Sequence, residues 1–192
     1  MSNSNQVKPR VGISGDPFRG WDLETIFKKI TQDLGLTYLD YWPENGGGES
    51  AATIRKLAEQ YGVTLYCYNV GAPQRLGGQG SQQEAVETIR VGIMEAAQLG
   101  IPYVQFYGSG ESVKDIWVTV NQVYQALEPL LDLAAKHNIT LLFENDYDES
   151  GLDTQGTSLK RKPEGIHALM SLVDSPHLRF SYDASNFNIA GE

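Results

Sequence analysis

The sequence predicts an α/β fold in which helices cover a parallel β-sheet. Apolar, β-type runs alternate with segments of helical period along the whole chain. The runs are mostly apolar throughout, which is typical of parallel strands that are buried on both faces. The chain has 192 residues, of which 41% are hydrophobic, and no shift of composition marks a linker. We therefore expect residues 1–192 to form a single domain with one sizeable core.

Composition and charge argue against several classes of protein. The net charge of -9 opposes binding to nucleic acid or to an anionic membrane, and the short basic stretch 159–165 reads as a solvated loop. No apolar run approaches the length of a membrane span. Residues 1–9 are polar and lack a secretory signal, so we expect a disordered tail and a cytoplasmic location. The single cysteine, Cys67, reads as a small buried hydrophobe.

Six short runs read as strands because each is mostly apolar and precedes a polar loop or a segment of helical period. The sixth run repeats the shape of the fifth, an apolar stretch that ends in an acidic residue. The strands are expected within residues 10–16, 37–42, 64–71, 103–110, 139–146 and 178–187.

The first two helices have clear start and stop signals. Asp22 is placed to cap the first helix, apolar residues recur on one face over residues 23–34, and Gly35 ends it. The second helix starts after Ser50 and ends at Gly62, with apolar residues along one side.

The later helices follow the same pattern. Ser81 precedes Glu84 by three residues, which predicts a capping box for the third helix. Ser112 is expected to cap a long fourth helix that runs to His137. A fifth helix is expected over roughly 163–173.

Two architectures accommodate such a parallel sheet. A doubly wound sheet usually carries a glycine-rich phosphate loop at its first turn, and "GISGDPFRGW" does not match a dinucleotide fingerprint. A (β/α)8 barrel carries polar groups at the C-terminal ends of several strands, as at Asp16, Glu144 and Asp183. We therefore expect the barrel. A complete barrel takes about 250 residues, so we expect about six βα units, with strands seven and eight missing or supplied from elsewhere.

Two acidic residues at strand ends suggest a metal site. Glu144 closes the fifth run and Asp183 closes the sixth, so a barrel would place their carboxylates side by side. Like charges in a partly dry pocket are tolerated when a cation lies between them or when one is protonated. Oxygen ligands favour Mg²⁺ or Mn²⁺, with Zn²⁺ or Co²⁺ left open. Alternatively, each acid caps a neighbouring helix or pairs with a lysine or arginine.

The stretch "LLFEND" and residues 163–192, "PEGIHALMSLVDSPHLRFSYDASNFNIAGE", resemble the xylose isomerase-like TIM barrels. These form the sugar phosphate isomerase/epimerase superfamily, which also includes inosose dehydratases and the endonuclease IV branch. The resemblance implies that Glu144 and Asp183 bind the metal and that Asn186 touches substrate. It also implies two further ligands, a histidine and a glutamate, on strands that this sequence lacks.

The resemblance further implies the chemistry. A metal-dependent sugar isomerase or epimerase moves a proton next to a carbonyl through a metal-stabilised enediolate, with Glu144 as both ligand and acid/base. The second base would lie on the missing eighth strand, so the 192-residue chain alone is expected to turn over little. A lyase of the inosose dehydratase type is a weaker alternative. An endonuclease would need several clustered histidines and a basic DNA face, and the sequence has neither.

Other residues at strand ends are candidates for substrate binding. Asp16 follows the first strand and Trp42 the second, where an aromatic face can stack on a sugar ring, although packing under loops explains them equally well. Tyr107 lies on the fourth strand, where relatives often have histidine. A non-catalytic sugar-binding or assembly module is the alternative to an enzyme. The open edges of an incomplete barrel also favour a homo-oligomer.

Overall fold

A computed structural model describes residues 10–70, 76, 82–108, 115–145, 159 and 163–190 of the chain. It divides into two compact units, Met1–Tyr66 and Cys67–Glu192, which are considered one at a time below. The expected disorder of residues 1–9 falls outside the described residues.

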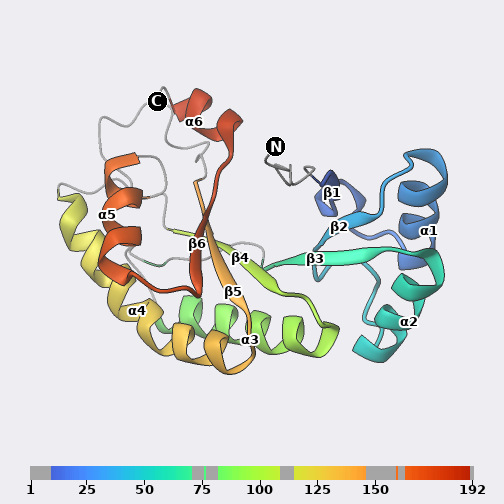
Figure 1. Cartoon of the computed structure of the whole chain (residues 1–192), viewed down its shortest axis with the longest axis horizontal. Coiled ribbons are helices and arrows are strands. Elements are labelled where there is room, and N and C mark those ends of the chain that lie inside the picture. The colour runs from blue at the N-terminus through green and yellow to red at the C-terminus, as the bar shows by residue number, and fades with distance from the viewer. Residues whose placement is uncertain are drawn as a thin grey trace, which may run out of the picture. The chain divides into compact units, whose positions relative to one another are not determined.

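Six parallel strands and six α-helices alternate along the described part of the chain, as the sequence predicts (Figure 1). Hydrogen bonding follows sequence order from β1 to β6, and every pairing is parallel where its register is defined. This is the strand–helix repeat of a TIM barrel, in six units where a complete barrel has eight. The strands are β1 Gly12–Ser14, β2 Tyr38–Tyr41, β3 Thr64–Asn69, β4 Tyr103–Tyr107, β5 Thr140–Glu144 and β6 Leu178–Ser181. The helices are α1 Leu23–Lys28, α2 Ala51–Tyr61, α3 Gln82–Leu99, α4 Ile116–Lys136, α5 Pro163–Val173 and α6 Ala184–Ala190.

In the first unit, α1 starts where the sequence predicts and ends differently. The Asp22 carboxylate accepts a hydrogen bond from the Thr25 N–H at 2.9 Å, which caps the helix. After Lys28 the helix widens into a π-helical turn, Lys29–Asp33, whose Leu34 N–H bonds to the Lys29 carbonyl. A π turn holds more residues than an α turn, so it rotates the next side chain off the apolar face. Leu34, expected on that face, is 46% exposed instead.

The second helix, α2, has both of its predicted ends. The Ser50 hydroxyl accepts a hydrogen bond from the Thr53 N–H at 3.2 Å. Gly62 ends the helix with φ of 65°, a left-handed conformation that glycine adopts without strain. Ile54 and Ala58 are its buried residues.

Replacing Ser50 with alanine is expected to lower the free energy of unfolding by about 1 kcal/mol, because the Thr53 N–H loses its acceptor. Urea-induced unfolding of the chain measures this difference. Ser50→Asp is the matched control, because it keeps an acceptor and adds a negative charge at the helix N-terminus, which is favourable there. Equal losses in both variants would contradict a capping role.

In the second unit, helices α3, α4 and α5 pack against β4, β5 and β6 respectively (Figure 1). The side chains that face these helices are fully buried and apolar. Because side chains alternate along a strand, the residues between them lie on the opposite face of the sheet, here called the inner face. The buried residues on the helix side are Val104, Phe106, Leu141 and Phe143, each 0% exposed.

Three further expectations concern single residues. The predicted cap of α4 is wrong: the helix begins at Ile116, and the Asp115 side chain accepts from the Trp117 N–H at 2.9 Å. Ser81 precedes α3 but lies outside the described residues, so its capping box stays a prediction. Cys67 is buried, as expected.

In the described part of the chain, no helix has the length and apolar character needed to cross a bilayer.

Candidate active site

Glu144 is the last residue of β5, and its side chain lies on the inner face. The preceding residue, Phe143, points toward the helices, so strand alternation directs Glu144 the other way. In the register of the sheet, Glu144 is opposite Tyr107 on β4 and Ser181 on β6. It is half-buried. The fold therefore explains an acid at the end of an apolar strand: alternation keeps the carboxylate out of the helix-side core.

A glutamine holds the Glu144 carboxylate. The Gln105 side-chain amide on β4 donates to Glu144 Oε2. The Gln105 carbonyl oxygen accepts from the Ser181 hydroxyl on β6 at 3.1 Å. One side chain thus links three adjacent strands on the inner face.

Asp183 lies two residues beyond the end of β6 and caps α6. Its Oδ1 accepts hydrogen bonds from the Ser185 N–H at 2.8 Å, the Ser185 hydroxyl at 2.7 Å and the Asn186 N–H at 3.0 Å. Burial raises the pKa of the Asp183 carboxyl, but the bonds from Ser185 and Asn186 outweigh burial and lower the pKa below its ordinary value. Asp183 therefore has the capping role left open above. The hydrogen bonds of its side chain within the described part of the chain all use Oδ1, so capping and a further ligand on Oδ2 are compatible.

The residue after Glu144, Asn145, joins the two chain segments that carry Glu144 and Asp183. Asn145 Nδ2 donates to the Asp183 carbonyl at 2.7 Å, and the Asp183 N–H donates to Asn145 Oδ1 at 2.8 Å. Asn186, expected to touch substrate, donates from Nδ2 to the Asn145 carbonyl at 3.0 Å and is buried. These residues extend the pairing of β5 and β6 beyond the last strand pair, Glu144 with Ser181. They hold the Glu144 and Asp183 segments together.

Truncating Asn145 to alanine is expected to lower the free energy of unfolding by about 2–3 kcal/mol. Asn145 is only 1% exposed, and the Asp183 N–H and carbonyl would lose partners in a partly buried place. Asn121→Ala is the matched control, because Asn121 bonds a helix carbonyl on the exposed side of α4. Urea unfolding compares the two. A difference from the control below about 1 kcal/mol would mean that the Asn145 bonds are replaced by water.

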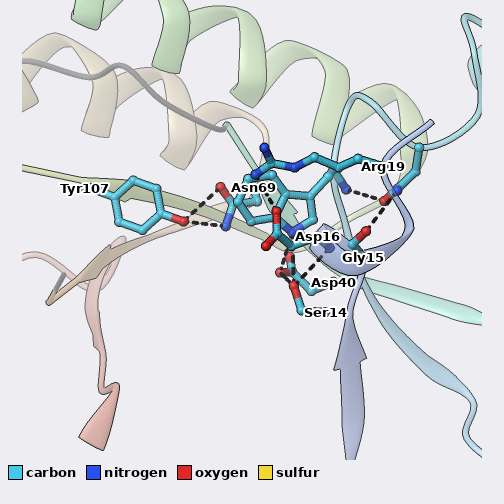
Figure 2. A network of polar contacts seen from close by, with 9 residues as sticks. Ser14, Gly15, Asp16, Arg19, Asp40, Asn69 and Tyr107 are labelled. Carbon is cyan, nitrogen blue, oxygen red and sulfur yellow. Dashed lines mark hydrogen bonds and ion pairs between the residues drawn. The ribbon is translucent and has the colours of Figure 1, made fainter. Parts of the chain in front are cut away.

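Tyr107 is a second inner-face residue next to Glu144. Figure 2 shows its hydroxyl against the side-chain amide of Asn69, with Asn69 Nδ2 to Tyr107 Oη at 3.0 Å and Oη to Asn69 Oδ1 at 3.3 Å. Asn69 is fully buried at the end of β3. Its amide therefore fixes the position of the phenol at the Glu144 level of the sheet.

The other two candidates, Asp16 and Trp42, belong to the first unit. Asp16 lies in a 3-10 turn, Asp16–Phe18, and pairs with Arg19 at 2.5 Å (Figure 2). The Trp42 indole N–H donates to Asp40 Oδ2 at 3.1 Å and to Ser14 Oγ at 3.2 Å. The Arg19 guanidinium lies 4.3 Å from the centre of the buried Trp42 ring. One ring face is therefore already occupied by a cation, which favours the packing interpretation of Trp42.

Glu144, Asp183, Asn186 and Tyr107 all belong to the second unit. Across the described ranges, no three or more His, Cys, Asp or Glu residues gather closely enough to hold a metal ion. The binding of a metal by the carboxylates of Glu144 and Asp183 therefore stays a prediction. Such hard oxygen donors suit Mg²⁺ or Mn²⁺, which also take water and substrate oxygens as ligands.

Sequence reasoning missed Gln105, Asn145 and Asn69. The sequence could have pointed to Asn145. It lies two residues after Phe143, so strand alternation puts both on the helix-facing side, where a polar side chain needs a hydrogen-bond partner. Gln105 and Asn69 are polar side chains on the inner face, within or at the end of apolar strands. Their partners could not be named without the register of the sheet.

Comparisons with known proteins agree with this architecture. The family described as "Xylose isomerase-like TIM barrel" matches residues 29–192. Among curated proteins there is no match.

Solved structures of low sequence identity share the fold. A xylose isomerase domain containing protein from Salmonella typhimurium is 19% identical with a TM-score of 0.67; the match covers 90% of this chain and 59% of that one. The 3-keto-D-glucoside 4-epimerase YcjR from E. coli is 14% identical with a TM-score of 0.73, covering 95% and 71%. The IOLI protein with a bound zinc atom is 12% identical with a TM-score of 0.75, covering 96% and 66%. This chain thus spans less than two thirds of the first of these.

The family match covers most of the chain, including every strand from β2 onward and both acidic strand-end positions. The chain therefore belongs to the xylose isomerase-like TIM barrel family.

Proposed function

We propose that this chain carries the proton-transfer part of a sugar isomerase or epimerase site. The observation that supports this most directly is the placement of Glu144. It is a half-buried carboxylate at the C-terminal end of a parallel strand, held by Gln105 and level with Tyr107. In TIM-barrel enzymes the C-terminal strand ends are where catalytic groups sit.

The family and the names of its structural neighbours support the same class of substrate. One neighbour is named a 3-keto-D-glucoside 4-epimerase and another a xylose isomerase domain containing protein. At 14–19% identity these names suggest a class only, a small sugar or polyol that carries a carbonyl.

In the proposed reaction Glu144 accepts a proton from the carbon next to the substrate carbonyl. Delivery of a proton to the neighbouring carbon gives isomerisation, whereas epimerisation requires a second group that delivers a proton to the opposite face of the same carbon. The Tyr107 hydroxyl is proposed to bond a substrate oxygen. Glu144 and Asp183 would hold a divalent cation, with Mn²⁺ or Mg²⁺ proposed. When bound, the cation supplies positive charge beside the carbonyl oxygen, where negative charge develops as the proton leaves.

Exchange of a carbon-bound proton with solvent tests the proposal, because this half-reaction requires one base and not two. The chain is incubated in D₂O with Mn²⁺ and a panel of ketoses, the Mn²⁺ is removed with a chelator, and proton NMR follows loss of the signal next to the carbonyl. We expect exchange that depends on the divalent ion and that is weaker in Asp183→Ala. No exchange with any ketose, together with no Mn²⁺ binding in a titration, would contradict the proposal.

A non-catalytic sugar-binding module is the second candidate. It is favoured by the small donor set, since the described residues bring together fewer than three candidate ligands. The same samples separate the two functions. Saturation-transfer NMR signals from a sugar without any proton exchange would indicate binding alone.

A further inference from the structure

Gln105 occupies a place that the proposed chemistry does not yet explain. It is a half-buried polar residue within β4, between the fully buried Val104 and Phe106. Its register partner on β5 is Leu142, one inward-facing position before Glu144. The Gln105 side chain therefore reaches toward the C-terminal end of the sheet to meet the Glu144 carboxylate.

The partners of Gln105 fix the direction of its amide. The Gln105 NH₂ group faces Glu144 and donates to its Oε2. The amide oxygen then faces β6, where the Ser181 hydroxyl donates to it at 3.1 Å. Ser181 is also the direct register partner of Glu144. The order Ser181 to Gln105 to Glu144 is thus a directional chain of hydrogen bonds across three strands.

We propose that Gln105 is a positioning residue for Glu144, and that Ser181 holds Gln105 in the orientation required. The inference deepens the proposed function and rests on it for its kinetic consequences. A bond to Oε2 restricts rotation of the carboxylate. Less entropy is then lost when the base is aligned with the carbon-bound proton. If Gln105 served only to fill space in the strand, a leucine of similar size would replace it without kinetic effect.

Two variants test the positioning role. Gln105→Leu removes the donor, and Ser181→Ala leaves Gln105 in place but removes its anchor. In the proton-exchange assay we expect kcat to fall by about 10- to 100-fold in Gln105→Leu and by about 3- to 10-fold in Ser181→Ala, with KM nearly unchanged. Gln122→Leu, the same substitution on the exposed side of α4, is the control and should be silent. A rise in KM at unchanged kcat would overturn the inference, since Gln105 would then bind substrate.

A measurement without turnover separates this inference from the proposed function. The ¹³C resonance of the Glu144 carboxyl group is assigned by its loss in Glu144→Gln and followed at constant pH. We expect it to shift in Gln105→Leu and, by a smaller amount, in Ser181→Ala. If the wild type shows neither exchange nor Mn²⁺ binding but the resonance shifts, the proposed function fails and the contact stands. An unmoved resonance in a folded Ser181→Ala and in Gln105→Leu would overturn the inference whatever the activity.

Discussion

Replacing Glu144 with glutamine is expected to slow exchange of the carbon-bound proton by about 10²- to 10⁴-fold. The substitution keeps the size and shape of the side chain but removes its ability to accept a proton. The remaining amide oxygen still accepts from the Gln105 NH₂ group, so the local hydrogen bond and the fold should persist. The loss should therefore appear in kcat, with a weaker effect on substrate binding.

Proton NMR in D₂O measures this rate, and a Mn²⁺ titration accompanies it because Glu144 is also proposed as a metal ligand. Glu128→Gln is the matched control: it makes the same change of charge on the exposed side of α4, in the same unit. A rate in Glu144→Gln within threefold of the control would show that another group accepts the proton. The inner face would then have to be searched again, beginning with Tyr107.

The fold was predictable because its signals are local. Alternation of apolar runs with helical segments predicts a parallel α/β sheet, and Asp22, Ser50 and Gly62 mark helix ends through short-range bonds that their own side chains or backbone make. The errors were local too. Asp115, three residues beyond Ser112, competes as a cap, and a π-helical turn before Leu34 breaks the 3.6-residue period.

The site was predictable only in part because its hydrogen bonds join residues far apart in sequence. Glu144 could be singled out as an acid that closes an apolar strand. The bond from Gln105 and the reciprocal pair of Asn145 with Asp183 each connect residues on different strands. Sequence patterns predict the strands without fixing which residues lie opposite one another, so these partners remained hidden. Asp183 could be assigned as a helix cap only once the start of α6 was known, and a helix of seven residues leaves too weak a sequence pattern to locate.

The core behind Glu144 should be the most sensitive part of the second unit. Truncating Phe143 to alanine is expected to lower the free energy of unfolding by about 3–5 kcal/mol. The ring is 0% exposed and meets Phe106 edge-on at 5.5 Å between centroids. The backbone also approaches it closely, since a Cβ at Gly108 would lie 3.0 Å from Phe143 Cζ. The closely packed residues around the ring cannot easily move into the cavity that the substitution leaves.

Two controls show whether this cost comes from the cavity. Phe143→Leu keeps most of the apolar volume and should cost about 1–1.5 kcal/mol, whereas Leu172→Ala on the half-exposed side of α5 should cost about 0.5 kcal/mol or less. Urea unfolding gives the three values, and hydrogen exchange at the amides of β4 and β5 locates the loss. Because Phe143 and Glu144 point to opposite faces of one strand, loosening the first should also loosen the second. A Phe143→Ala protein as stable as Phe143→Leu would show that β5 is held by its strand pairing alone, and that the packing does not fix where the carboxylate points.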